Sequence, residues 1–445
     1  MPSHSSRRKF LKAAGLGAAA ALAGCSSARR DNRPNIVLIM ADDLGYECLG
    51  CYGGTSYKTP HLDELARTGI LFQHAYAQPL CTPTRLQLMT GQYNFRNWKA
   101  FGIMDPDEKT FGPMMQQAGY KTCLAGKWQM WSYNPPDYEP EWRAKGMKIE
   151  DAGYDEYCVW HAFHTEDKGS RYADPTIYEN GTLHQEMKGK YGPDVFCNYI
   201  NGFMERHREQ PFFVYYPMAL THPPFNPTPH SEDWNSGDRL RNDRKYFKDM
   251  VEYMDVIVGR IVSKIDELGL RENTLILFYS DNGTLRGVKS TVGGSEVEGG
   301  KGLATDAGTR VPLIANWKGV TPGGRVLDDL VDSTDFMPTI AEMAGARLPE
   351  GVTIDGKSFL PQLRGERGNP REWVLVHHDP RPGWDKDGYT LVRFARDQRF
   401  KLYSDGKLYD VPADLLERSP IPPGQGGPEA EAARKKLQAV LDTMV

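Results

Sequence analysis

Cys81 lies in the segment CTPTRLQLMTG, residues 81–91, where the types and spacing of the residues suit reactive chemistry. Pro83 suits the first turn of a helix, since the N–H group that proline lacks would have no partner there. Cys81 is therefore expected at a helix N-terminus, where free backbone N–H groups and the helix dipole favour anions. Arg85 follows one turn later and adds positive charge. The pattern predicts an anion site beside a cysteine; its plain alternative is a buried cysteine before an ordinary helix.

Polar and charged side chains also follow four apolar runs of the sequence. A continuous apolar run is typical of a strand buried on both faces of a parallel sheet. In open α/β sheets, ligands bind outside the carboxyl ends of the strands, so we expect these side chains to meet at one edge. The runs are 35–40, 121–125, 212–216 and 274–279, and they are followed by Asp42 and Asp43, by Lys127, by His222, and by Asp281 and Asn282.

Four of these side chains offer oxygen atoms that suit a metal ion. Asp42, Asp43, Asp281 and Asn282 carry hard carboxylate and amide donors, which favour Ca²⁺ or Mg²⁺ rather than zinc. Because most of the four are acidic, we expect an unneutralised cluster unless a divalent cation binds among them. Each also has a plain alternative, since Asp-Asp and Asp-Asn-Gly are common in turns and helix caps.

The basic residues complete a site for an anionic substrate. Arg85, Lys127 and Lys301 supply fixed positive charge, which binds an anion without a change of protonation. His222 is the natural candidate for protonating a departing alcohol, since the imidazole pKa lies nearest neutrality. Lys127 taken alone is equally typical of a solvated surface.

These residues lie in motifs that resemble the family-I, formylglycine-dependent sulfatases of the alkaline phosphatase superfamily. The resemblance covers roughly residues 33–445. The matching segments are RPNIVLIMADDLGYECLGCYGG (33–54), TPHLDELARTGILFQHAYA (59–77), CTPTR (81–85), GYKTCLAGKW (119–128), THPPF (221–225), FYSDNG (278–283), GGKG with GTRVPLI (299–314) and DGKLYDV (405–411).

The resemblance implies hydrolysis of sulfate esters by an arylsulfatase-like enzyme. In that family a maturation enzyme oxidises the cysteine to 3-oxoalanine (formylglycine), and the hydrated aldehyde attacks the sulfur of the ester. The second hydroxyl of the hydrate then provides a route to expel sulfate, which a plain thiol lacks. Carried over to this sequence, Cys81 is the residue that becomes formylglycine.

The same resemblance implies roles for the other residues. The implied ligands of a single calcium ion are Asp42, Asp43, the modified Cys81, Asp281 and Asn282. The side chains implied to surround the sulfate are Arg85, Lys127, His222 and Lys301. One position departs from the family pattern, because relatives usually carry Gly-Lys-Trp-His and this chain has Gln129 in the last place. Glutamine forms hydrogen bonds but does not titrate. The route by which sulfate is released is therefore left open, whereas the reaction class is unaffected.

The first 30 residues are typical of an export signal. A basic stretch with Arg7 and Arg8 precedes an apolar run (13–23) that is too short for a permanent membrane span. The paired arginines resemble a twin-arginine signal, and Leu-Ala-Gly-Cys at 22–25 resembles a bacterial lipobox with a lipid-bearing Cys25. We therefore expect a bacterial protein exported by the twin-arginine machinery to the periplasm, or held at the cell envelope only through Cys25. A generic cleaved signal peptide is the alternative.

Composition sets the class of the remaining chain. Of the 445 residues, 40% are hydrophobic, and the mean hydropathy of -0.56 is typical of a soluble globular protein. A net charge of -4, with no basic stripe, argues against nucleic acid as a partner. The expected partners are a sulfated carbohydrate or aryl sulfate, the maturation enzyme and the export machinery.

Alternating strand and helix patterns predict an α/β fold. We expect a large doubly wound mixed sheet flanked by helices over 31–350, the catalytic domain, and a small α+β domain with an antiparallel sheet over 351–445. Residues 151–192 match no motif, and we expect them to form a variable rim that sets substrate selectivity. Helices are predicted at 60–68, 110–118, 248–268 and 429–444, and later strands at 373–377, 389–394, 400–403 and 408–411.

Three functions are compatible with this sequence. The first is a sulfatase acting on carbohydrate sulfate esters. The second is a phosphodiesterase or phosphonate monoester hydrolase of the same superfamily, which side-by-side assays of sulfate and phosphate esters would distinguish. The third is a non-catalytic lipoprotein that binds sulfated glycan, which only Gln129 favours. The intact run from Cys81 to Arg85, with both lysines, argues for the first.

Overall fold

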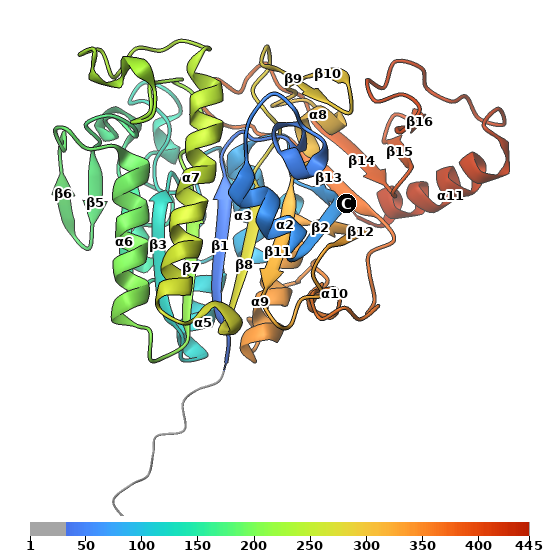
Figure 1. The fold of residues 1–445 in the computed structure, drawn as a ribbon. Coiled ribbons are helices and arrows are strands. Elements are labelled where there is room, and N and C mark those ends of the chain that lie inside the picture. Colours follow the sequence, from blue (N-terminus) through green and yellow to red (C-terminus); the bar gives the residue numbers. More distant parts are fainter. Residues whose placement is uncertain (1–32, 445) are drawn as a thin grey trace, which may run out of the picture. The chain divides into compact units, whose positions relative to one another are not determined.

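The computed structural model describes residues 33–444 (Figure 1). The export signal predicted for residues 1–30, and Cys25 with it, lies outside the described residues. Within that described range, no helix is both long enough and apolar enough to cross a membrane.

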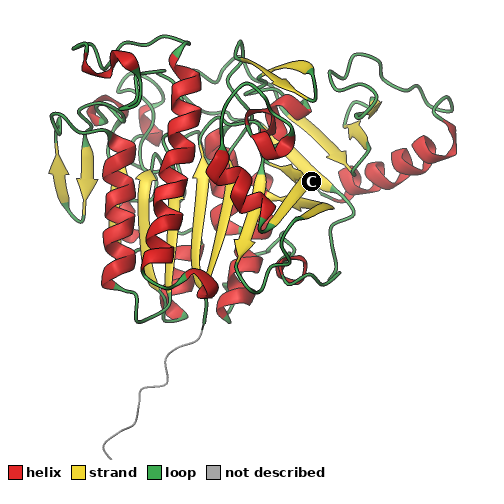
Figure 2. Ribbon diagram, in the orientation of Figure 1, coloured by secondary structure: helices red, strands yellow, loops and turns green. Residues whose placement is uncertain are grey.

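One large mixed sheet runs through the described chain (Figure 2). Its strands are β1 Asn35–Ala41, β2 Ile70–Tyr76, β3 Lys121–Lys127, β4 Glu156–Trp160, β5 Ile177–Glu179, β6 Thr182–His184, β7 Phe212–Pro217, β8 Thr274–Ser280, β11 Leu313–Trp317 and β12 Arg325–Asp332. They are ordered β12-β2-β11-β8-β1-β7-β3-β4-β5-β6. Strands β8, β1, β7, β3 and β4 are parallel neighbours, so their carboxyl ends lie at one edge of the sheet.

Strand β1 shows why such a run forms a central strand. Every residue of this strand is buried. Ile36, Leu38 and Met40 face one hydrophobic core, whereas Val37 and Ile39 face the other. Because successive side chains point to opposite faces, a strand covered on both sides requires a continuous apolar run.

Helices cover both faces of the sheet (Figure 1). One face carries α2 Pro60–Arg67, α6 Gly192–Arg206 and α7 Tyr246–Glu267. The opposite face carries α3 Cys81–Thr90, α5 Phe111–Gln117 and α9 Phe336–Ala344. This is the doubly wound α/β arrangement that the sequence predicts. The shorter helices are α4 Asn94–Asn97, α8 Asp306–Thr309 and α10 Leu360–Leu363.

The C-terminal part of the chain builds a separate antiparallel sheet. Its strands are β13 Val374–His378, β14 Val392–Arg396, β15 Phe400–Tyr403 and β16 Leu408–Asp410, in that order. Helix α11 Gly427–Thr443 packs on this sheet, and Leu437 shares a core with Leu375 and Leu402. The predicted α+β character is confirmed, while the domain boundary at residue 350 stays a prediction. A buried ion pair of 2.5 Å between Arg396 and Asp306 ties this sheet to α8.

The segment 151–192 supplies strands as well as loops. β4 lies parallel to β3, with Trp160 opposite Lys127, and β5 and β6 extend the sheet beyond it. These strands were not predicted, because they are too short to show a clear sequence pattern, and the selectivity rim stays a prediction. His161 follows β4 directly, so the segment reaches the same sheet edge as Lys127. A hairpin of β9 Lys289–Val292 and β10 Ser295–Glu298 stands apart from the main sheet.

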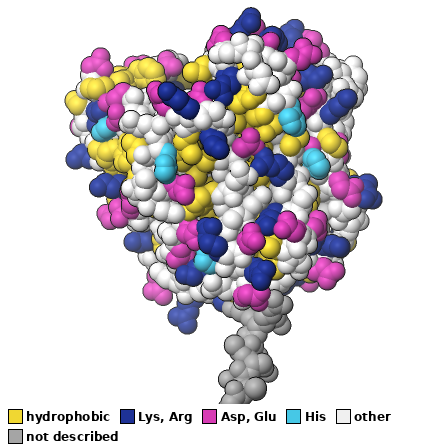
Figure 3. Space-filling model, turned by 60° about the vertical axis from the view of Figure 1, so that its left-hand side comes forward, with side chains coloured by type: hydrophobic (Ala, Val, Ile, Leu, Met, Phe, Trp, Pro, Cys, Tyr) yellow, Lys and Arg dark blue, Asp and Glu magenta, His cyan; other side chains and the backbone are white. Residues whose placement is uncertain are grey.

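Charge on the surface is mixed. On the face drawn in Figure 3, basic and acidic side chains are interspersed among neutral ones. Buried cations lie at the sheet edge described next.

Candidate active site

The residues predicted from the sequence meet at the carboxyl edge of β1, β3 and β8. The acidic and amide side chains there are fully buried, and Arg85 and Lys127 are only 2% exposed. Three ion pairs connect them: Lys127 Nζ to Asp42 Oδ2 at 2.8 Å, Lys301 Nζ to Asp43 Oδ2 at 2.7 Å, and Arg85 Nη2 to Asp281 Oδ2 at 2.7 Å. The expectation that separate strand ends deliver these groups to one place is confirmed.

Asp42 is held as a carboxylate by its neighbours. Burial alone would raise its pKa, but the charges of Lys127, Arg85 and Lys301 outweigh burial, and the pKa lies well below the usual range. Arg85 Nη2 lies 3.6 Å from Asp42 Oδ2, in addition to the lysine contact. The other carboxylate oxygen, Oδ1, is buried and has no hydrogen-bond partner.

Asp43 turns the chain sharply at the end of β1. Its φ of 62° lies in the left-handed region, which residues other than glycine seldom adopt and which is concentrated at functional sites. Consecutive side chains of an extended strand diverge, so this turn lets Asp42 and Asp43 face one centre. Asn282 Nδ2 donates to Asp43 Oδ1 at 2.8 Å, and His222 Nε2 lies 3.9 Å from Asp43 Oδ2.

Asp281 joins β8 to the first turn of α3. Arg85 donates to its Oδ2 from Nε at 3.0 Å and from Nη2 at 2.7 Å, and Thr84 Oγ1 donates to its backbone oxygen at 2.6 Å. Burial and the charge of Asp42 raise the pKa of Asp281 to about 7, although Arg85 opposes the rise. These contacts fix the start of α3 against the acidic cluster.

One expectation from the sequence is wrong: the acidic cluster is not left unneutralised. Each of its three carboxylates is ion-paired with a different cation. Two buried oxygen atoms nevertheless lack partners, Oδ1 of Asp42 and Oδ1 of Asn282. Ligand atoms of Asp42, Asp43 and His222 also lie within 4.8 Å of one another. The residues present therefore fit a hard divalent cation, because orphaned buried oxygens are costly unless a ligand satisfies them.

Cys81 is the first residue of α3, as the position of Pro83 predicts. Its side chain is 3% exposed and packs with Leu80 and Phe101. Burial alone would lower the pKa of Lys301, but Asp43 and then Cys81 raise it, which places the cysteine within electrostatic reach of the lysine. The cysteine thus lies at a helix N-terminus inside a cationic site.

His222 lies on the loop after β7, and a backbone carbonyl sets its tautomer. Nδ1 lies 2.6 Å from the carbonyl oxygen of Pro223, so this nitrogen donates and Nε2 faces Asp43. Burial, with the positive charges of Lys301 and Arg171, holds the pKa of His222 well below its ordinary value, although Asp42 opposes this. The resting ring is therefore neutral, with its free nitrogen towards the site.

Gln129 lies two residues beyond Lys127 in a second left-handed turn, with φ of 53°. Its backbone N–H donates to the carbonyl oxygen of His161 at 3.1 Å, and the residue is buried. Sequence reasoning did not single out His161 or the nearby Arg171 as site residues. They belong to no motif, and only the pairing of β3 with β4 brings them close to Lys127.

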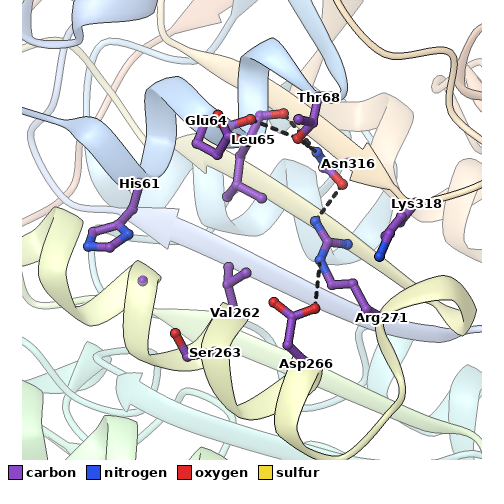
Figure 4. A pocket seen from close by; sticks show the side chains of 11 residues that line it. His61, Glu64, Leu65, Thr68, Val262, Ser263, Asp266, Arg271, Asn316 and Lys318 are labelled. Carbon is purple, nitrogen blue, oxygen red and sulfur yellow. Dashed lines mark hydrogen bonds and ion pairs between the residues drawn. The ribbon is translucent and has the colours of Figure 1, made fainter.

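The described residues also line a cavity away from this site. Its volume is about 380 Å³, and its walls come from α2, α7 and the end of β11 (Figure 4). Arg271 Nη2 donates to Asn316 Oδ1 at 2.6 Å across it. It shares no residue with the acidic and basic cluster.

Comparison with known proteins agrees with the fold and identifies the family. Residues 34–346 match the family model for Sulfatase, so the chain belongs to the sulfatase family. Human arylsulfatase A is 33% identical over 383 residues, which cover 77% of this chain and 70% of that protein. The chain is accordingly a sulfuric ester hydrolase of the alkaline phosphatase superfamily.

Solved structures share the fold across most of the chain. The crystal structure of Ps i-CgsB has a TM-score of 0.73 at 25% identity and covers 92% of each chain. The structure of BT4656 in complex with its substrate, D-glucosamine-2-N,6-O-disulfate, has a TM-score of 0.72 at 22% identity, and the match covers 92% of this chain and 97% of that one. The mixed sheet and the C-terminal antiparallel sheet are thus features of sulfatase folds.

Proposed function

We propose that this sulfatase acts on sulfated carbohydrates, with formylglycine made from Cys81 as its nucleophile and one Ca²⁺ as its metal ion. The proposal rests chiefly on one observation: Cys81 begins α3, the helix whose Thr84 and Arg85 donate hydrogen bonds to Asp281 of the oxygen cluster. Formylglycine, once formed by a maturation enzyme, supplies a hydroxyl nucleophile that also permits release of sulfate.

Aromatic side chains between Cys81 and the surface support a ring-shaped substrate. Phe101 packs on Cys81, and its ring centroid lies 5.1 Å from that of Tyr133. Trp384 follows at 6.0 Å from Tyr133 and is 41% exposed. Flat apolar rings suit the C–H faces of a pyranose and equally an aryl group. The sulfated glucosamine bound by one protein of this fold is a reason to test sugars first.

The calcium proposal rests on the donor set and its orphaned atoms. Asp42, Asp43, Asp281 and Asn282 supply oxygen ligands, with the modified residue 81 as the fifth. Bound Ca²⁺ would supply positive charge against a sulfate oxygen.

The chain's own side chains bind the sulfate and handle the proton. Arg85, Lys127 and Lys301, together with the N-terminus of α3, hold a sulfate monoanion in a buried setting where charges act strongly. His222 presents Nε2 to the leaving oxygen, and its Nδ1–H bond to Pro223 fixes the ring for that task. Burial of the carboxylates keeps bulk water away from these charges.

Two sets of assays test the proposal. The first compares 4-nitrophenyl sulfate with 4-nitrophenyl phosphate, and we expect the sulfate to be hydrolysed in preference. A preference for the phosphate would favour the phosphodiesterase or phosphonate hydrolase alternative. The second measures sulfate release from defined sulfated mono- and oligosaccharides. Cleavage of the aryl ester without any sugar would refute the carbohydrate assignment, and inactivity on every substrate would favour a non-catalytic glycan-binding protein.

We also propose export through the twin-arginine route, with Cys25 as a lipid anchor. The support is the sequence alone, in Arg7, Arg8 and the run that ends at Cys25. Cell fractionation of the wild type and a Cys25→Ala variant tests it. Loss of envelope attachment in the variant is expected, and an unchanged distribution would refute the anchor.

A further inference from the structure

Two cations and a histidine gather just beyond β4, one strand away from the sulfate site. The guanidinium carbon of Arg171 lies 3.9 Å from the ring centroid of Trp160, and Lys168 Nζ lies 5.8 Å from the same centroid. His161 is the next residue after Trp160, with ring centroids 5.1 Å apart. Two positively charged groups therefore lie over the indole ring of Trp160.

These cations have no carboxylate partner among the residues that the structure describes. Glu166 and Asp174, acidic residues of the same segment, pair instead with Arg143 and Arg239. Burial and the charges of Arg171 and Lys127 lower the pKa of Lys168 to about 8, with no acidic residue opposing them. Two like charges beside each other without a counterion repel, and a bound anion relieves that repulsion.

Unsatisfied polar atoms point to the same conclusion. Arg171 is only 8% exposed, and its Nη1 is buried without a hydrogen-bond partner. Nδ1 of the buried His161 is also unpartnered. A buried donor without a partner loses the hydrogen bonds that water gave it, and a charged donor loses most. Stacking on Trp160 satisfies the face of the guanidinium but not its N–H groups.

The cluster adjoins the reaction site directly. In the pairing of β3 with β4, Lys127 lies opposite Trp160. Tyr172, the residue after Arg171, donates its hydroxyl to the backbone oxygen of Ala219 at 2.6 Å and also bonds to that of His222. The hydroxyl of Tyr172 therefore ties the segment that carries Arg171 to the loop that carries the proposed proton donor.

We propose that Arg171, Lys168 and His161 form a second anion subsite, which binds another sulfate or a carboxylate of the sugar whose first sulfate is removed. This inference rests on the proposed function and narrows it to substrates with at least two anionic groups. The sites for the two groups lie on neighbouring strand ends, so both belong to one sugar or to two linked sugars. The residues are specificity determinants and take no part in bond cleavage.

The test measures sulfate release from matched pairs of sugars. One arm compares glucosamine 6-O-sulfate with glucosamine 2-N,6-O-disulfate, and the other compares a sulfated hexose with the corresponding sulfated uronic acid. A sugar that is not cleaved is measured instead as an inhibitor of 4-nitrophenyl sulfate hydrolysis. In the wild type we expect the added anion to raise kcat/KM about 10- to 100-fold, which is the usual effect of a charge-assisted contact. For a sugar that is not cleaved, we expect the inhibition constant to fall by the same factor. The arm that shows the gain identifies the anion as sulfate or carboxylate.

Substitutions of Arg171 and Lys168 test whether these residues bind the second anion. Arg171→Met and Lys168→Met should each remove at least tenfold of the preference for the doubly charged sugar. Arg171→Lys, which keeps the charge, should restore part of it. Arg208→Met removes an exposed arginine whose side chain is 56% accessible, and it should leave the preference intact. Circular dichroism and melting temperature identify any variant that fails to fold. Lys168→Met disturbs the fold less than Arg171→Met, because Lys168 is only half-buried.

Two results would overturn the inference. Either the wild type shows no preference for a second anion in either arm, or folded Arg171→Met and Lys168→Met retain the full preference. Failure of the proposed function looks different, because the wild type would then hydrolyse no sulfate ester in any arm. An enzyme that cleaves singly and doubly sulfated sugars equally would keep the proposed function and lose the subsite.

Discussion

Replacing His222 by alanine is expected to damage turnover in a way that depends on the leaving group. The alkoxide that leaves a sugar sulfate is strongly basic and needs a proton, whereas an activated phenolate leaves without one. The structure presents Nε2 of His222 to the site and fixes the ring through Nδ1 and Pro223, so the substitution removes the proposed donor at a defined position. The loss should therefore be large for a sugar sulfate and small for 4-nitrophenyl sulfate.

The expected size follows from the state of the ring. A positioned general acid contributes about 10²- to 10⁴-fold, which corresponds to roughly 3 to 5 kcal/mol of barrier. Burial and the charge of Lys301 lower the pKa of His222, so the ring is neutral at rest and only a minor fraction carries the proton that must be donated. We therefore expect a loss near the lower limit, about 10²-fold on a sugar sulfate.

The assay compares kcat/KM on both substrates in one preparation. His230→Ala is the matched control, since this exposed histidine lies in the same loop region and should leave both rates unchanged. Equal losses on the sugar and the aryl ester would refute the role as acid and assign His222 to binding. In that case Lys301→Ala should show the leaving-group dependence instead, because Lys301 is the other donor beside Asp43.

Further predictions concern the nucleophile, the metal ion and the response to acid. A tryptic peptide containing residue 81 should carry an aldehyde in protein made beside a maturation enzyme, and Cys81→Ala should remain folded but inactive; unmodified cysteine in fully active protein would contradict this. Asp281→Asn should lower both bound calcium, measured by atomic emission, and turnover. Chelation should stop turnover reversibly, and Ca²⁺ at 100 times its Kd should restore about 2.7 kcal/mol of stability, measured as melting temperature; if chelation changes neither, the metal assignment is wrong. Burial lowers the pKa of His378 from 6.5 to about 3, so below pH 6.5 the unfolded chain takes up a proton that the folded chain does not, and stability falls as pH falls through that window. His378→Phe should reduce this fall in melting temperature between pH 6.5 and 4.

The sequence predicts the parts of the site that follow strands with a clear pattern. Asp42 and Asp281 follow long apolar runs, and parallel strands of one sheet must end at one edge, so their convergence needs no coordinates. The N-terminal position of Cys81 in α3 likewise follows from Pro83. These features depend on local residue types and on a general property of α/β sheets.

The partners of these residues could not be predicted in the same way. The pairing of Asp43 with Lys301 joins residues that are far apart in the chain, and no local pattern reports it. The sequence places Arg171 in the segment 151–192, which is expected to set selectivity, but its contacts could not be predicted because they depend on strand β4, which has only five residues. Net charge is visible in a sequence, but which charges neutralise one another depends on distances that only the folded chain sets.

Burial of helix α3 has a consequence for the proposed oxidation of Cys81. All ten residues from Cys81 to Thr90 are buried, so the folded protein offers no accessible peptide around the cysteine to a modifying enzyme. The oxidation of Cys81 that we propose would therefore take place while this stretch is still extended, before α3 packs against the sheet. A twin-arginine exporter carries chains that have already folded, and in that case the oxidation belongs to the interval between synthesis and folding inside the cell. Purified, folded protein with unmodified Cys81 should resist activation by the maturation enzyme until it is unfolded.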